Sequence, residues 1–286
     1  NTTPAKALFA KTAEKAEQPA ERGAKALRHL GALAFLDNTQ EALQAYRRAT
    51  QLDPNNVDGW NQLGHSLARV GNLTEAIATY NTVLALGDKH GDKREIVVAY
   101  GNLGAIYQRR GDLDKAFEFH QKVLKLGEDL GDKENMACAY NDLGNIYRIH
   151  GDLDKATKLY KKALNLERDL GNKEGMAVVY RNFGIIYQMR GDLGKAFEFH
   201  QKALNLERDF GNKEGIAVVY GNLGLVYQKR GDLDKAIEFY QKALKLYEDL
   251  GNKEGMAGVY GNFGIIHQTR GDLDKAIEFY QKALKL

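Results

Sequence analysis

The chain has 286 residues, of which 43% are hydrophobic and 28% are charged, and its 41 basic and 38 acidic side chains leave a formal net charge of +3. The apolar share suffices for a core, while the interleaved charges disfavour nucleic acid, which normally requires a concentrated basic face. No apolar run approaches the roughly 20 residues that a membrane-spanning helix needs, so we expect no membrane insertion.

The first segment, residues 1–22, is rich in alanine and carries three spaced lysines. It lacks the uninterrupted apolar stretch of a signal peptide. We predict a partly ordered helical segment here. It caps the domain that follows, lies in the groove of that domain, or forms a frayed end. In the groove, Leu8 and Phe9 would be its anchors.

From residue 23 to the end the chain is built of repeats, and the later copies are 40 residues long. Gly91 and Gly111 both recur at this interval, which divides each copy into two halves of about 20 residues. Apolar residues within each half recur every three or four positions, and no proline occurs after Pro54. This pattern predicts two amphipathic helices per repeat. The approximate repeats are 23–54, 55–90, 91–130, 131–170, 171–210, 211–250 and 251–286.

The junctions between these halves carry signals for helix ends. In Arg230-Gly231-Asp232, the arginine suits a last helical turn and the glycine suits the left-handed position that follows. The aspartate can cap the next helix. We therefore expect each helix to be followed by another after a tight turn.

The repeated residues resemble the pattern of the tetratricopeptide repeat, W-x2-L-G followed by a glycine and A-x3-Y/F. The usual repeat of this family has about 34 residues, so the 40-residue unit is lengthened and resembles those of the Pins/LGN polarity adaptors, rapsyn and kinesin light chain. The resemblance implies an all-α fold, a right-handed superhelical solenoid of about seven antiparallel helix pairs. The matching residues of one repeat are Trp60, Leu63, Gly64, Gly71, Ala76 and Tyr80, with Tyr180, Phe183, Gly184, Tyr187, Gly191 and Ala196 in another.

Small residues mark the place where the two helices of a repeat cross. Gly184 and Ala196 fall at this crossing, and a larger side chain there would overpack the contact. One helical pair cannot bury its own apolar stripe, so each repeat depends on its neighbours for stability.

The other side of the first helix of each repeat is expected to line a concave groove, as the resemblance also implies. With Tyr180 counted as position 4, this side contains positions 5, 6, 9, 12 and 13. Amide side chains at positions 6 and 12 can hydrogen-bond the main chain of an extended peptide, and apolar pockets and positive charges lie beside them. The predicted peptide-binding residues are Asn102, Asp142, Asn182, Asn222 and Asn262 at position 6, Gln108, Arg148, Gln188, Gln228 and Gln268 at position 12, Asn145, Ile185, Leu225 and Ile265 at position 9, and Arg109, Arg181, Met189 and Lys229. Alternatively, the asparagines orient the adjacent first helices, and Ile185 and Leu225 pack against the next repeat.

No catalytic or cofactor-binding motif is found in the sequence. His120 and His200 stand where sister repeats have tyrosine, so we interpret them as aromatic fillers and not as metal ligands. Cys138 is the sole cysteine, which excludes an intramolecular disulfide and fits a reducing compartment such as the cytoplasm. We expect no enzyme activity, no cofactor and no metal.

The leading hypothesis is a non-enzymatic scaffold whose groove binds a peptide segment or helix of a partner protein. One alternative is a homo-oligomer that packs end to end through apolar residues near the C-terminus, such as Phe279 and Leu284. Another is the targeting arm of a larger enzyme or signalling protein.

Overall fold

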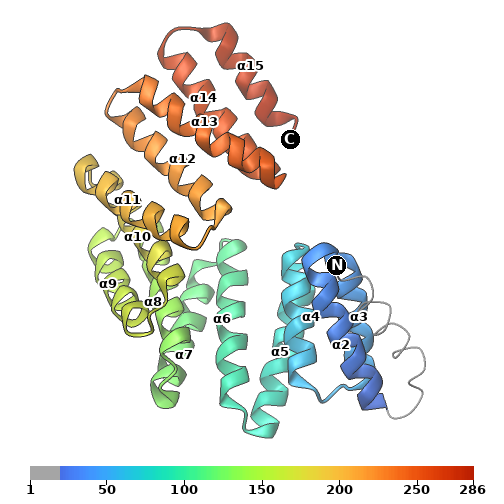
Figure 1. Cartoon of the computed structure of the whole chain (residues 1–286). Helices are drawn as coiled ribbons and strands as arrows, with labels where there is room; N and C mark the ends of the chain where they lie inside the picture. The colour runs from blue at the N-terminus through green and yellow to red at the C-terminus, as the bar shows by residue number, and fades with distance from the viewer. Residues whose placement is uncertain (1–19) are drawn as a thin grey trace. The chain divides into compact units, whose positions relative to one another are not determined.

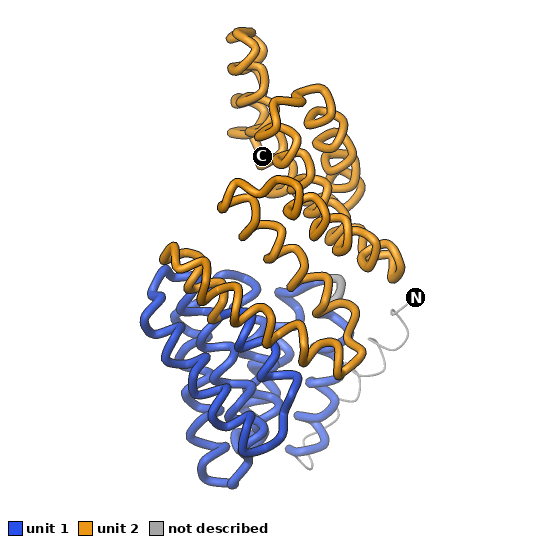
Figure 2. The backbone as a smooth tube through the Cα atoms, turned by 90° about the vertical axis from the view of Figure 1, so that its left-hand side faces the viewer, with its two compact units in different colours: residues 1–142 blue, residues 143–286 orange. Residues whose placement is uncertain are grey.

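A computed structural model describes residues 20–286, in which every element is a helix and no strand occurs. The predicted N-terminal segment, with Leu8 and Phe9, lies almost wholly outside the described residues, and its residues 20–22 begin the first described helix. The chain divides into two compact units, residues 1–142 and 143–286, which are coloured separately in Figure 2. The boundary falls within one helix, and each unit is described by itself.

Unit 1 is a series of antiparallel helix pairs. Within it α2 packs on α3, α4 on α5, and α6 on α7 (Figure 1). Its helices are α2 (Ala20–Asp37), α3 (Thr39–Leu52), α4 (Val57–Arg69), α5 (Leu73–His90), α6 (Lys93–Arg109), α7 (Leu113–Leu130) and the first part of α8 (Lys133–Ile149).

Unit 2 repeats this arrangement. It begins in the last turns of α8, and α10 then packs on α11, α12 on α13, and α14 on α15. Its helices are α9 (Leu153–Asp169), α10 (Lys173–Met189), α11 (Leu193–Asp209), α12 (Lys213–Lys229), α13 (Leu233–Leu250), α14 (Lys253–Thr269) and α15 (Leu273–Leu284). The helical repeat solenoid predicted from the sequence is confirmed.

The turn between α12 and α13 shows why the helices follow one another so closely. Gly231 has a φ of 81°, a conformation that a residue with a Cβ rarely adopts. The backbone N–H of Asp232 donates to the carbonyl of Tyr227 at 3.0 Å and closes the end of α12. The carboxylate of Asp232 then accepts the backbone N–H of Lys235 at 3.2 Å and caps α13.

A glycine on the first helix faces a ring on the second helix at each pair crossing. A Cβ on Gly184 would lie 2.3 Å from Cε1 of His200, and one on Gly64 would lie 2.8 Å from Cζ of Tyr80. Ala196 is completely buried beside this contact. The close crossing predicted at Gly184 and Ala196 is therefore present.

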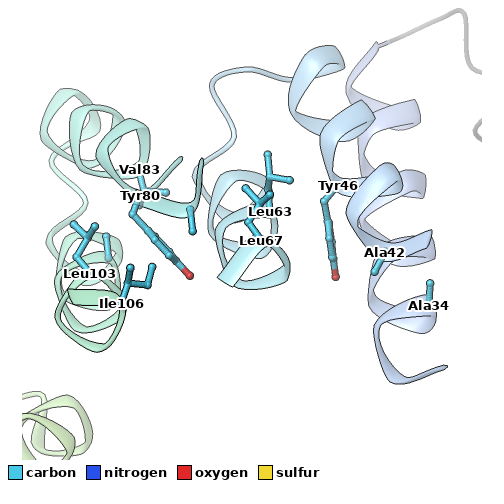
Figure 3. Close-up of a cluster of buried hydrophobic side chains, with 11 residues drawn as sticks. Ala34, Ala42, Tyr46, Leu63, Leu67, Tyr80, Val83, Leu103 and Ile106 are labelled. Atoms are coloured by element: carbon cyan, nitrogen blue, oxygen red, sulfur yellow. The ribbon is translucent and has the colours of Figure 1, made fainter. Parts of the chain in front are cut away.

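The core of unit 1 runs from one helix pair into the next, as Figure 3 shows. Tyr46 of α3 belongs to the same cluster as Leu63 and Leu67 of α4. Tyr80 of α5 likewise packs with Ile106 of α6. Each pair therefore completes its core only with its neighbour, which makes stability depend on nearest-neighbour interfaces.

Candidate ligand-binding face

The first helices of neighbouring repeats contact one another within each unit. In unit 1 α4 contacts α6, and in unit 2 α12 contacts both α10 and α14. The second helices cover their other side. Each unit therefore presents a face formed by its first helices.

In unit 1 this face contains three successive hollows. The hollow between α2 and α4 has a volume of about 220 Å³, and the one between α4 and α6, which Arg69 and Arg109 line, has about 310 Å³. The third, of about 260 Å³, lies between α6, α7 and α8 and is lined by Asp142. Asn102 lines both the second and the third hollow, so the position-6 amide stands between two spaces that a side chain could enter.

The position-6 asparagines of unit 2 occupy one place on each first helix. Asn182 of α10, Asn222 of α12 and Asn262 of α14 are all half-buried. Their spacing repeats every 40 residues, and the helices that carry them adjoin. The structure thus brings these three predicted residues onto one face.

The position-12 residues of unit 2 are largely engaged within the protein. Gln228 accepts a hydrogen bond from the hydroxyl of Tyr240 at 2.7 Å, and Gln268 accepts one from Tyr280 at 3.0 Å. Gln188 is buried, and its side-chain Nε2 donates to the backbone carbonyl of Asn222 at 3.3 Å. The side-chain oxygens of Gln228 and Gln268 thus join the two helices of their pairs, whereas the side-chain N–H groups of these two residues can still donate.

Two of the predicted cationic residues also have partners on the protein. Arg181 donates to the carboxylate of Glu207 at 2.8 Å, and Arg109 donates to the carbonyl of Ala68 at 2.8 Å. Glu207 is only 1% exposed and accepts a further bond from Asn212 at 2.8 Å. Burial raises the pKa of Glu207, and the nearby Arg181 opposes this rise.

The remaining predicted residues differ in exposure. Met189 and Ile265 are 48% and 43% exposed, as a ligand contact requires. The hydroxyl of Tyr160 donates to Asn145 at 2.8 Å, which commits that amide oxygen to the helix pair. Lys229 is exposed, whereas Gln108, Arg148, Ile185 and Leu225 are half-buried.

Sequence reasoning missed Asn135 and Cys138, which line the hollow beside α8, and Glu207 of α11, the buried partner of Arg181. A signal for Glu207 exists in its neighbour Gly215, where a Cβ would lie 2.2 Å from the Glu207 carboxylate. Glycine at position 215 therefore makes room for a side chain at position 207. In unit 1 the counterpart of Glu207 is Gly127, where a Cβ would lie 2.8 Å from Cγ of Met136.

The histidines at the pair crossings are buried and neutral. His120 and His200 are 1% and 0% exposed, and burial lowers the pKa of each to about 4. Both rings pack against a glycine of the first helix, Gly104 and Gly184 respectively. They fill the tyrosine position, as interpreted from the sequence. Among residues 20–286 no group of three or more His, Cys, Asp or Glu side chains is placed to hold a metal ion.

The family's sequence profiles match most of the chain. The profile described as Tetratricopeptide repeat matches residues 58–129, 135–209 and 215–286, and a second, described as TPR repeat, matches residues 36–71. The chain belongs to the tetratricopeptide repeat family. None of the described helices of these repeats is both long and apolar enough to cross a membrane.

Solved structures of low sequence identity share the fold of these repeats. The apo form of the quorum sensor NprR from B. thuringiensis has a TM-score of 0.82 at 15% identity, covering 99% of this chain and 81% of its own. Aspartyl phosphate phosphatase F from Bacillus subtilis has a TM-score of 0.76 at 12% identity, covering 95% and 73%. BtubC (BKLC) from P. vanneervenii has a TM-score of 0.61 at 23% identity, covering 79% and 92%. A search of curated proteins finds no match.

Proposed function

We propose that this protein is a non-enzymatic interaction module that binds an extended segment of a partner protein on the face of its first helices. The observation that carries the proposal is the series Asn182, Asn222 and Asn262, which places one half-buried amide on each adjoining first helix of unit 2. A primary amide offers both donors and an acceptor, so this series suits the main chain of an extended peptide.

Other features support a groove of this kind. Met189 of α10 and Ile265 of α14 have exposed apolar side chains that would add apolar contacts to such a groove. In unit 1 the corresponding face is hollowed between α4 and α6 and again between α6 and α8. A role in sensing is consistent with the shared fold of the quorum sensor NprR.

The test is selection from a random peptide library displayed on phage, followed by affinity measurement on purified protein. We expect the double variant Asn182→Ala with Asn222→Ala to bind the selected peptides at least about tenfold more weakly, because two hydrogen-bonding groups are lost. The matched control is Asn165→Ala with Asn205→Ala, which removes two exposed asparagines from the second helices α9 and α11. Equal affinity of both double variants, with unchanged helical circular dichroism, would contradict the proposal.

A second candidate function is end-to-end association between copies of the chain. Leu273 and Ile277 of α15 are 60% and 54% exposed, whereas their counterparts Leu233 and Ile237 of α13 pack against a core cluster. The occupant proposed for this apolar face is a second copy. Sedimentation of the parent chain at increasing concentration tests this association, with Ile277→Glu as the comparison. A parent chain that stays monomeric at every concentration, as Ile277→Glu should, would rule it out.

A further inference from the structure

The hollow between α4 and α6 in unit 1 is lined by positive charges alone. Eight residues line it, among them Arg69 of α4 and Arg109 of α6, and none of the eight is acidic. We propose that this hollow binds the carboxylate of an aspartate or glutamate side chain of the bound segment, with Arg69 and Arg109 as its ion-pair partners. The inference rests on the function proposed above and specifies a residue type that the segment carries.

Arg69 is held in place without losing its hydrogen-bond donors. Its guanidinium carbon lies over the ring of Phe35 of α2, at 4.5 Å from the ring centroid. A guanidinium in this position uses its face for the ring, so the N–H groups along its edge stay available. No carboxylate of residues 20–286 forms an ion pair with Arg69. Its edge can therefore receive an anion that enters the hollow.

Arg109 is anchored to the opposite helix of the hollow. Its Nη1 donates to the backbone carbonyl of Ala68, the residue before Arg69, at 2.8 Å. This bond uses one of the five N–H groups of the guanidinium and ties the arginine of α6 to the end of α4. Each arginine thus has a contact that restricts it before a ligand arrives, which lowers the entropy cost of binding.

The two positive charges are not offset by the other residues of the hollow. Desolvation lowers the pKa of His65, and the nearby Arg69 lowers it further, so this ring is mostly neutral near pH 7. The side-chain amide of Asn102 lines the hollow from α6 and can add a neutral N–H donor. Because like charges repel, an anion that enters gains attraction from both guanidiniums.

The size and position of the hollow fit a side chain of the segment. Its volume of about 310 Å³ has room for a carboxylate with its methylene groups, which Ala105 and Ile106 in the lining can contact. The hollows of about 220 Å³ and 260 Å³ lie on either side of it along the first helices of unit 1. A segment that continues into both must place a side chain here, whereas a C-terminal carboxylate would end it.

The sequence confines the pair of arginines to this hollow. Both occupy position 13 of their helices, and the later first helices have other residue types there, namely Ile149, Met189, Lys229 and Thr269. Two guanidiniums from successive repeats therefore meet only between α4 and α6. The same comparison shows that the fold accepts uncharged side chains at position 13, so both arginines can be replaced in a test.

The test uses peptides that are selected from the random phage library on the parent protein and synthesised with an amidated C-terminus. We expect them to share an acidic residue and to bind Arg69→Gln with Arg109→Gln about tenfold more weakly, because a charge-assisted contact is lost. Changing the acidic residue to its amide should weaken binding as much on the parent and little further on the double variant, since both changes remove one interaction. The matched control is Arg48→Gln with Arg94→Gln, which removes two exposed arginines of α3 and α6 outside the hollow and should leave the affinity unchanged.

His65 provides an independent readout because it lines the hollow together with Arg69. A bound carboxylate opposes the effect of Arg69 and favours the protonated ring. At saturation, the pKa of His65 should therefore be higher in the complex with the acidic peptide than in the complex with its amide counterpart. Nuclear magnetic resonance titration measures this pKa, with the signal assigned by its loss in His65→Gln. Equal pKa values in the two complexes would place the carboxylate elsewhere and overturn the pocket.

The failures of the two proposals are distinguishable. If Asn182→Ala with Asn222→Ala weakens peptide binding but Arg69→Gln with Arg109→Gln does not, the pocket is overturned and the proposed function stands. If only the arginine variant weakens binding, the pocket is supported and the amide series of unit 2 is overturned. If no library peptide binds, or neither double variant differs from its control, both proposals fail.

Discussion

Two glycines three residues apart on α12 provide the sharpest test of how the repeats are held together. Gly221 lies on the face of the first helices, and a Cβ there would meet no atom within 4 Å. Gly224 lies at the pair crossing, where a Cβ would be 2.6 Å from Cε1 and 2.7 Å from Cδ1 of Tyr240. The same substitution by alanine should therefore have opposite effects on stability at the two positions.

The expected magnitudes follow from two contributions. Replacing glycine by alanine inside a helix favours folding by about 0.5–1 kcal/mol, and this gain is common to both variants. At Gly224 the new methyl is about 1 Å closer to the ring than the usual 3.5–4.0 Å carbon contact. Tyr240 cannot turn away, since it is fully buried, its hydroxyl donates to Gln228 at 2.7 Å, and its ring packs edge-on against Phe263 at 5.9 Å. Overpacking of this kind costs about 1–3 kcal/mol.

The difference in stability between Gly221→Ala and Gly224→Ala isolates the contact, because the helix-propensity gain cancels. It should amount to about 1–3 kcal/mol, or a separation of at least about 2 °C between the two melting temperatures. Urea and thermal unfolding followed by far-ultraviolet circular dichroism measure it. Melting temperatures that shift equally and in the same direction would refute the tight crossing of glycine and ring.

Three further changes have directions fixed by the structure. Below pH 6.5 the histidines of the unfolded chain become protonated, whereas buried His120 and His200 of the folded chain stay neutral down to about pH 4. The free energy of unfolding should therefore decrease as pH falls through this window, by up to about 1.4 kcal/mol per pH unit for each histidine. The double variant His120→Tyr with His200→Tyr should show a flatter pH profile in urea unfolding. Arg181→Leu should cost about 3–5 kcal/mol by leaving the Glu207 carboxylate buried without its cation. Because the pKa of Glu207 then rises further, the stability of Arg181→Leu should decline as pH increases above 4.5, and adding Glu207→Gln should remove this decline. Gly231→Ala should lower stability by about 1–2 kcal/mol, since its φ of 81° opposes a Cβ, and Gly231→Asn should lower it less, as melting curves would show.

The helix pairs could be predicted from the sequence because their determinants are local and repeated. A capping side chain such as that of Asp232 bonds the N–H three residues on, so its effect is visible in a short stretch of sequence. The crossing at Gly184 could be predicted for a related reason. The repeat aligns a small residue on the first helix with a ring on the second, and the period of 40 residues shows the pairing several times.

The bonds of the face could not be predicted in the same way. Whether Gln228 points to a ligand or accepts from Tyr240 depends on the distance between two helices, which no spacing within one helix specifies. The pair of Arg181 and Glu207 joins residues 26 positions apart in sequence, and it appears in a single repeat, so no periodicity reveals it. Which amide side chains form bonds within the protein is thus visible only in the three-dimensional contacts.

The same contrast explains where the repeats of this chain can diverge. Gly104, Gly184, Gly224 and Gly264 remain glycine because a ring occupies the space where a Cβ would be. Three residues earlier on the same helices, the chain alternates between Gly101, Arg181, Gly221 and Gly261, because a side chain there points away from the crossing and costs little in packing. Substitutions on this face can therefore change shape and charge while the pairs stay intact. At this position Arg181 reaches the buried Glu207 in one repeat, whereas a Cβ on Gly101 of another repeat would meet only Cγ2 of Val123, at 4.0 Å.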